Sequence, residues 1–211
     1  MGIQERKERE KVRKREVILK AAEKIFFKNG YEKTTMDEIA EKAEYSKGTL
    51  YLYFKNKEAL YAAIMLRSID IFIKILEEEI SKAKGGSARL AAIKKAYLKF
   101  YLGHSDHMKV FLFASSYIMQ LQKADSNAIM EEIMEKDKIF KGIIYSSIED
   151  AAKDGTLEAL GVTGDAESIY QAGGIVFNGI YKNIIDLETA FKTYNVKPED
   201  AVNLAYGLLR I

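Results

Sequence analysis

A short stretch near the N-terminus concentrates side chains that can contact nucleic acid. Hydroxyl groups at the start of a helix favour phosphate binding, because the first backbone amides of the helix are free to donate to an anion. A lysine reaches phosphate, a glycine lets the backbone approach a duplex closely, and tyrosine hydroxyls can contact phosphates or base edges. We expect DNA contacts from Thr35, Ser46, Lys47, Gly48, Thr49, Tyr51, Tyr53 and Lys57. Packing alone is the expectation for Phe54 and Leu50, and it is the alternative for the two tyrosines.

Helix-start signals place these residues on two short helices. Thr35 and Glu38 form a capping box, in which the hydroxyl accepts from the third helical amide and the glutamate reaches back. The first helix is expected from Met36 to Ala43, and Ser46 caps a second helix from Lys47 to Phe54. Two short helices joined by a tight turn predict a helix-turn-helix, whose second helix enters the major groove of DNA.

The whole chain predicts an all-α fold, because good helix formers dominate and the single proline, Pro198, suits the first turn of a helix. Apolar residues at helical spacing begin at Val17, after a mixed-charge run over residues 4–16 that we expect to be a frayed arm. This first helix should end at Asn29-Gly30. Later helices are expected over residues 57–83, 87–103, 106–122, 126–154, 165–187 and from 198 onward, about nine helices in total. We expect an N-terminal three-helix helix-turn-helix domain over residues 1–56 and a larger C-terminal helical bundle over 57–211.

The distribution of charge favours a nucleic-acid partner only modestly. Residues 1–60 hold 15 Lys and Arg against 11 Asp and Glu, whereas the remainder holds 18 against 20. The positive excess therefore lies at the N-terminal end, as in a DNA-binding domain, although a solvated helix with mixed charges has the same composition. The chain has no cysteine, no signal peptide and no apolar stretch long enough to span a bilayer. We therefore expect a cytoplasmic protein with no membrane partner.

Two other classes of protein compete with a DNA-binding protein. An enzyme is disfavoured, because no Ser/His/Asp arrangement, phosphate-cradling glycine loop or convincing metal cluster is found. His104 and His107 flank Asp106, but exposed histidines beside a helix-start aspartate explain this cluster more simply than a metal site. A membrane-surface protein is disfavoured, because the basic arm has almost no apolar stripe before Val12. We expect no catalysis, no metal and no cofactor.

Two segments together resemble the DNA-binding domain of the tetracycline-repressor (TetR) family. They are GYEKTTMDEIA, from Gly30 to Ala40, and SKGTLYLYFKNKEAL, from Ser46 to Leu60. The resemblance covers residues 15–65, and its tyrosine-rich helix ending in Tyr-Phe before Lys-x-Lys-Glu is specific. The departure is Glu44-Tyr45, where such proteins usually have Gly-Val or similar in the turn. A non-glycine residue in a left-handed turn costs about 1 kcal/mol, so the turn is reshaped or Tyr45 reaches toward DNA.

This resemblance implies a ligand-responsive transcription regulator, a repressor that binds a palindromic operator as a homodimer. The half-sites of the double-stranded operator would lie about one helical turn apart. The resemblance also implies that residues 57–211 sense a ligand and dimerise, with the last two long helices of each subunit forming a four-helix interface. Residues at helical spacing there favour such an interface, and ordinary core positions are the alternative: Ile169, Gly173, Val176, Ile180, Ile184, Val202 and Leu208.

The resemblance further implies a ligand pocket inside the C-terminal bundle. This part of the chain is rich in Tyr, Phe and Met, a lining that suits an apolar or aromatic small-molecule effector with a few polar contacts. The candidate lining residues are Phe100, Met108, Phe111, Tyr117, Tyr145 and Phe177. Each of them taken alone is more simply explained as a core residue than as a ligand contact.

Overall fold

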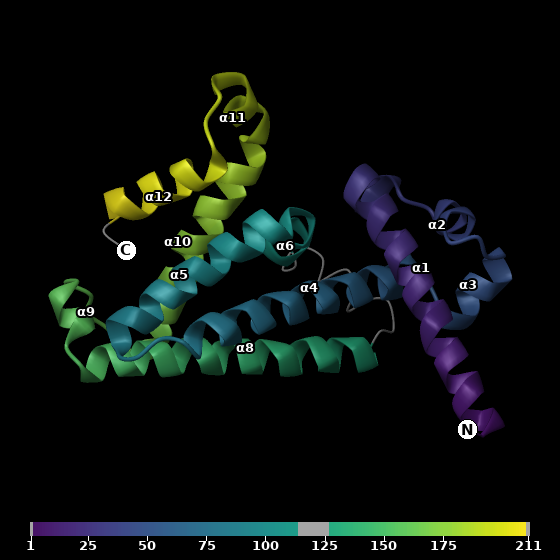
Figure 1. The fold of residues 1–211 in the computed structure, drawn as a ribbon, viewed down its shortest axis with the longest axis horizontal. Coiled ribbons are helices and arrows are strands. Elements are labelled where there is room, and N and C mark those ends of the chain that lie inside the picture. Colours follow the sequence, from purple (N-terminus) through teal and green to yellow (C-terminus); the bar gives the residue numbers. More distant parts are fainter. Residues whose placement is uncertain (1, 114–126, 210–211) are drawn as a thin grey trace. The chain divides into compact units, whose positions relative to one another are not determined.

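The computed structural model describes residues 2–113 and 127–209 of the chain, which form two compact units. Across these described residues the chain has eleven helices and no strand, which confirms the predicted all-α fold (Figure 1). One unit holds residues 2–67 and 127–133, and the other holds residues 68–113 and 134–209. The unit that contains the N-terminal helices thus extends beyond residue 56, and the functional division at that residue stays a prediction.

The first unit contains α1 (Ile3–Lys33), α2 (Met36–Lys42), α3 (Lys47–Tyr53) and the start of α4 (Lys57–Ile80). Each helix buries one apolar face, as amphipathic helices do. The core residues come from all four helices: Ile18, Ala22, Phe26, Ile39, Leu50, Leu60 and Tyr61. As predicted, the regular part of α1 ends at Gly30, which has a φ of 77°.

The N-terminal segment corrects one expectation. Residues 4–16 are not a frayed arm, because α1 is helical from Ile3 onward. Glutamate–lysine pairs one turn apart stabilise such a helix, and here Glu10 pairs with Lys14 at 2.8 Å and Glu16 with Lys20 at 3.6 Å.

Helix α8 (Asn127–Lys153) begins in the first unit and continues into the second from residue 134 onward. Besides this part of α8 and the rest of α4, the second unit contains six further helices. These are α5 (Gly86–Gly103), α6 (Ser105–Leu112), α9 (Thr156–Ala159), α10 (Ala166–Asp186), α11 (Glu188–Tyr194) and α12 (Pro198–Leu209). Asp165 caps α10 by accepting from the Ser168 amide at 2.8 Å, and Pro198 begins α12 as predicted.

Two differences from the expected helices concern the second unit. The short helices α9 and α11 were not predicted, because four to seven residues are too few to establish a helical period. Of the helix expected over residues 106–122, α6 supplies the part to Leu112, and residues 114–122 lie outside the described residues. Within the described helices, none combines the length and apolar character needed to cross a membrane.

Candidate nucleic-acid interface

The two short helices begin with the caps that the sequence predicts. The Glu38 amide donates to Thr35 Oγ1 at 3.2 Å, and the Thr35 amide donates to Glu38 Oε2 at 2.8 Å, which completes the capping box of α2. At α3 the Thr49 amide donates to Ser46 Oγ at 3.1 Å. These bonds satisfy amides that a helix start leaves unpaired, so they fix where each helix begins.

The turn between α2 and α3 is not reshaped, although Glu44 stands where the resemblance leads us to expect glycine. Glu44 has a φ of 58°, and the Tyr45 amide donates to the Ala40 carbonyl at 3.0 Å. The Glu44 amide donates to the Glu41 carbonyl at 3.0 Å. This pair of bonds is the Schellman arrangement, which normally places glycine at the left-handed position. The motif therefore keeps its geometry with glutamate in that position, at a conformational cost of about 1–2 kcal/mol.

Helix α3 has one buried side and one exposed side. Leu50 and Phe54 are buried, which confirms the packing role expected for both. Lys47 and Gly48 are exposed, and Tyr51 keeps 44% of its surface exposed. Thr49 and Tyr53 are half-buried. The structure thus holds these residues on one short, well-capped helix with a face open to a partner.

Two of the predicted phosphate contacts have partners inside the chain. Lys47 Nζ lies 2.6 Å from Asp37 Oδ1 on α2, and this hydrogen bond raises the pKa of Lys47. Lys57 Nζ donates to the Tyr31 carbonyl at 3.0 Å and lies 4.3 Å from the centroid of the Tyr31 ring. Lys47 is exposed at a surface ion pair, which phosphate can displace at little cost. Lys57 is half-buried and holds the start of α4 against the end of α1.

One residue on the exposed face of α3 was not predicted as a contact. Leu52 is 83% exposed, in the middle of the helix. Its position two residues from Leu50 and from Phe54 places it on the side of the helix away from the core. This spacing could have identified Leu52 as an exposed residue from the sequence alone. A leucine at such a position can contact the methyl group of thymine.

The candidate ligand residues fall into two separate groups in the second unit. Phe100 and Phe111 pack around Phe72, with ring centroids 4.9 and 5.0 Å from it. Tyr97 continues this cluster, because its ring lies 4.6 Å from Phe72 and 4.8 Å from Phe177. Met108 is also fully buried. We call Phe72, Tyr97, Phe100, Met108, Phe111 and Phe177 the aromatic cluster.

Tyr145 does not join the aromatic cluster. Its ring stacks on Tyr170 at 5.1 Å, and its hydroxyl donates to Glu167. This hydrogen bond raises the pKa of Tyr145 to about 12. Tyr117, the remaining candidate, lies outside the described residues.

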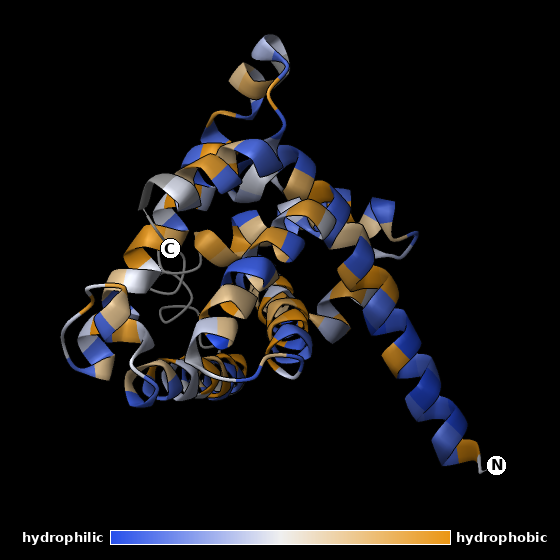
Figure 2. Cartoon of the chain, turned by 60° about the vertical axis from the view of Figure 1, so that its left-hand side comes forward, coloured by the Kyte–Doolittle hydropathy of each residue, from blue (hydrophilic) through white to orange (hydrophobic). Residues whose placement is uncertain are grey.

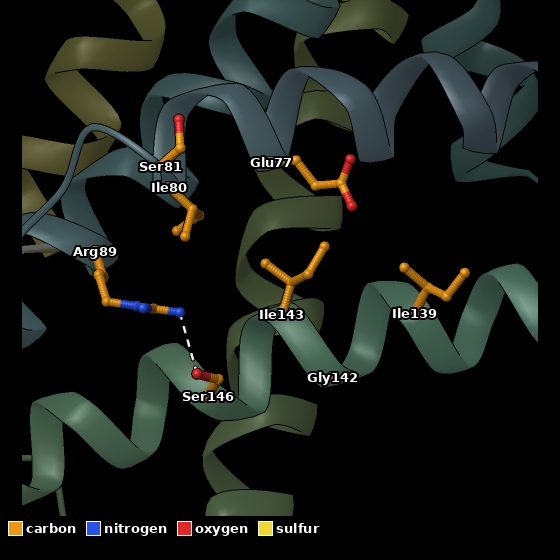
Figure 3. Close-up of a pocket in the computed structure, with 8 residues that line it drawn as sticks. All are labelled: Glu77, Ile80, Ser81, Arg89, Ile139, Gly142, Ile143 and Ser146. Carbon is orange, nitrogen blue, oxygen red and sulfur yellow. Dashed lines mark hydrogen bonds between the residues drawn. The ribbon is translucent and has the colours of Figure 1, made fainter.

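An open groove of about 430 Å³ lies elsewhere in the second unit, between α4, α5 and α8 (Figure 3). Arg89 borders it and donates to Ser146 Oγ at 3.1 Å. Its other lining residues are Glu77, Ile80, Ser81, Ile139, Gly142 and Ile143. None of the described candidate ligand residues lines this groove.

Within the described residues no group of three or more His, Cys, Asp or Glu is arranged to hold a metal ion. His107 instead places Nδ1 2.9 Å from Ser68 Oγ.

The candidate dimer residues differ in how much surface they have left. Val202 is 0% exposed and Ile184 is 5% exposed within the chain itself, so neither has appreciable surface to lose to a partner. Four residues of α10 are half-buried, namely Ile169, Gly173, Val176 and Ile180. The side chain of Leu208 lies outside the described residues. Among the described side chains of α10 and α12, the large apolar residues that are most exposed are instead Ile175, at 75%, and Leu204, at 64%.

The capped, exposed α3 defines a DNA-binding protein of the helix-turn-helix class, and comparison with known proteins finds similar regulators. Residues 18–64 match the family model described as bacterial regulatory proteins, tetR family. The HTH-type transcriptional regulator YhgD of Bacillus subtilis (strain 168) is 29% identical over 145 residues, 69% of this chain and 72% of that protein. The N-terminal part of the chain is therefore similar to the DNA-binding domain of tetR-family bacterial regulators, and YhgD, which the chain matches over most of its length, is named as an HTH-type transcriptional regulator.

Solved structures of regulators share the fold over most of the chain. The fatty acid degradation regulator FadR from Bacillus halodurans superposes with a TM-score of 0.69 at 17% identity, covering 93% of this chain and 94% of that one. AibR, solved in complex with isovaleryl coenzyme A and operator DNA, superposes with a TM-score of 0.61 at 22% identity, covering 80% and 83% of the two chains. These structures thus share the helical fold over most of the chain, including helices that follow residue 64.

Proposed function

We propose that this chain is a homodimeric repressor that binds a palindromic operator and is released by a small apolar or aromatic effector. The observation that carries the proposal is the capped α3, which presents Lys47, Gly48, Tyr51 and Leu52 on one open side. Thr35, Ser46 and Thr49 accompany it near the helix starts, where free amides favour phosphate. The operator is double-stranded DNA, so the protein acts in the cytoplasm.

Base reading and phosphate binding are divided among these side chains. Lys47 exchanges its exposed bond with Asp37 for a phosphate oxygen, because exposed ion pairs contribute little stability. Gly48 meets nothing but the Ser46 hydroxyl within 4 Å of the position of a β-carbon, so the backbone can come close to the duplex. Tyr51 and Tyr53 direct hydroxyls toward base edges or phosphates. Lys57 adds at most a weak contact, since it holds the Tyr31 carbonyl.

The homodimer is formed through α10 and α12. Ile175 and Leu204 are large apolar residues left open to solvent on these helices, and association would remove this surface from water. Ile169, Gly173, Val176 and Ile180 are half-buried, and each has further area to lose to a partner. Twofold symmetry then repeats α3 in successive major grooves, which makes the operator a palindrome.

The effector site is the aromatic cluster of the second unit. AibR was solved with isovaleryl coenzyme A, and the FadR structure concerns a regulator of fatty acid degradation, so acyl chains are the first candidates. Stacked and edge-on rings provide the apolar surface that an acyl or aromatic group requires. The rings pack on one another at 4.6–5.0 Å between neighbours, so a ligand must displace at least one of them. Binding therefore requires a rearrangement within this unit.

Effector binding and operator binding are coupled through a shift between two conformations. The effector binds better to the conformation whose recognition helices are spaced wrongly for the operator. Helix α4 belongs to both compact units, which makes it the natural connection. Because the coupling is reciprocal, the operator must weaken effector binding by the same factor.

Selection of bound sequences from a random pool of duplexes tests this function. We expect an enriched palindrome, and a fall of affinity with salt on both operator and unrelated DNA. Tyr51→Ala should weaken operator binding much more than non-specific binding, since a base contact distinguishes the two. Adding acyl-coenzyme A thioesters of increasing chain length during fluorescence anisotropy should release the operator for one length class. No enrichment of any duplex would reject the regulator, and unchanged operator affinity at saturating thioester would reject that effector class.

A further inference from the structure

Helix α1 projects beyond the domain that it helps to form. Every residue from Gly2 to Arg13 is exposed, so this part of the helix touches nothing that buries it. Residues 3–13 extend it by about 17 Å at 1.5 Å per residue. A helix of this length that buries no face is only marginally stable in water. The projecting part of α1 is accordingly coloured mostly hydrophilic (Figure 2), and its exposed large apolar residues are Ile3 and Val12.

One face of α1 changes character where the helix leaves the domain. Inside the domain this face carries Ile18, Ala22 and Ile25, which are buried or half-buried. Residues three and four positions apart lie on the same face of a helix. Stepping back from Ile18 by four, three and four residues reaches Lys14, Lys11 and Lys7. We call these three residues the lysine stripe.

The lysine stripe begins beside the recognition helix. The Arg15 guanidinium lies 4.9 Å from the centroid of the Phe54 ring, at the C-terminal cap of α3. Lys14 lies close enough to Tyr53 and Tyr45 to interact with both electrostatically. Both helices belong to the first unit, and Figure 1 shows α1 continuing past α3 toward the N-terminus. The stripe therefore starts in the same unit as α3, next to the residue that contacts the C-terminal cap of that helix.

The chemistry of the stripe determines its partner. If the partner were apolar, this face would continue with apolar residues beyond Ile18. It carries lysines instead, which favour an anionic partner. Residues 3–15 contain seven Lys and Arg against three Glu, so the projection as a whole is cationic. One of these acids, Glu10, pairs with Lys14 at 2.8 Å in an exposed bond that phosphate can replace.

We propose that the lysine stripe is a second DNA-contacting surface, which binds phosphates of the same duplex that α3 reads. This inference rests on the proposed function, because it requires the protein to bind DNA. The stripe spans about 10 Å along the helix, so its three ammonium groups can reach separate phosphates. It supplies affinity without sequence information.

The test compares two triple variants that remove the same charge from the same helix. One is Lys7→Gln, Lys11→Gln and Lys14→Gln. The matched control is Arg6→Gln, Arg9→Gln and Arg13→Gln, whose side chains lie on another face of the projection. Glutamine is a good helix former, so both variants keep the helix, which circular dichroism checks. Fluorescence anisotropy at several salt concentrations then gives the slope of log affinity against log salt for the selected operator and for an unrelated duplex.

We expect the lysine variant to lose about 5 from the magnitude of this slope, since each phosphate contact contributes about 0.9 and the proposed homodimer carries two copies of the stripe. The loss should be equal on the operator and on unrelated DNA, and the arginine variant should lose less than about 1. Equal losses of slope in the two variants would mean that only the total positive charge of the projection matters, and would overturn the proposal. Unchanged slopes, with a parent chain that still selects its operator, would overturn the stripe and leave the regulator intact. A parent chain that binds no duplex would overturn both proposals. Lost binding to anionic vesicles with an unchanged DNA slope would assign the stripe to membranes and also overturn the proposal.

Discussion

The contact between α5 and α8 gives the sharpest stability prediction, at Gly86. A β-carbon at this position would lie 2.2 Å from the Cα of Ala151 and 2.6 Å from its backbone nitrogen. These are backbone atoms of a fully buried residue, so they cannot rotate away. The Gly86 amide also donates to Asp154 Oδ2 at 2.6 Å. Gly86→Ala therefore forces the two helices apart by about 1 Å before ordinary van der Waals contact is restored.

The expected cost follows from three contributions. Overpacking a close contact costs about 1–3 kcal/mol. Weakening the hydrogen bond to the Asp154 carboxylate removes up to about 1.5–3 kcal/mol more. The higher helix propensity of alanine offsets this loss in the free energy of unfolding by at most about 1 kcal/mol. We expect Gly86→Ala to lower the free energy of unfolding by about 2–4 kcal/mol and the Tm by roughly 5–15 °C.

Gly142→Ala is the matched control for this prediction. Gly142 lies inside α8, and a β-carbon there would meet nothing within 4 Å. This substitution should raise stability by about 0.5–1 kcal/mol. Thermal and urea unfolding followed by circular dichroism, at one fixed protein concentration because dimerisation contributes to stability, measures both variants. If Gly86→Ala unfolds at or above the Tm of the parent chain, the inferred contact between α5 and α8 is refuted.

The remaining predictions concern pH, the turn and base recognition. Hydrogen bonds from Lys95 and Lys99 lower the pKa of Glu79 from 4.5 to about 2, so its ionised form adds stability above pH 4.5 that is lost as the pH falls toward 2. Glu79→Gln should therefore unfold more easily in urea at pH 7, by about 1–2 kcal/mol after screening of the exposed lysines, and this difference should shrink at low pH; a difference independent of pH would contradict it. Glu44→Gly should raise stability by about 1 kcal/mol in thermal unfolding and Glu44→Ala should not, because only glycine relieves the left-handed φ; equal effects would argue against strain. Replacing thymine by uracil in the selected operator should weaken binding about 3–4-fold at a position that Leu52 contacts, at about 0.8 kcal/mol for a methyl group, and this effect should vanish in Leu52→Ala. Persistence of the uracil effect in that variant would exclude Leu52 as the reader.

The helix starts were predictable because a few adjacent residues determine them. The bonds of Thr35 with Glu38 and of Ser46 with Thr49 each involve residues three apart in the sequence. The turn at Glu44 was the exception, because it keeps the left-handed geometry where we expected a reshaped turn. Buried Leu50 and Phe54 follow from helical periodicity. Such local features need no knowledge of which helices later meet.

Features that depend on contacts between distant segments were not predictable in this way. The family resemblance and the aromatic composition assigned Phe100 and Tyr145 to one ligand lining, but the structure places them in separate groups. Composition does not show which helices face each other. Val202 and Ile184 have the spacing of an interface, and burial inside their own chain cannot be distinguished from burial by a partner in the sequence alone. The ion pair of Lys47 with Asp37 joins residues on different helices, so no local pattern of residues indicates it.

If both the proposed function and the proposed lysine stripe hold, α3 and α1 contribute to DNA binding in different ways. On α3 one lysine, itself paired with Asp37, accompanies side chains that can distinguish bases, so this helix contributes mainly selectivity. On α1 the lysine stripe carries no base-reading chemistry, so it contributes mainly salt-dependent affinity. A substitution on α3 should then change the ratio of operator to non-specific binding, whereas a substitution in the stripe should change both by the same factor. Because the two sets lie on different helices, their effects on the free energy of binding should be nearly additive, except for Lys14, which interacts electrostatically with Tyr53.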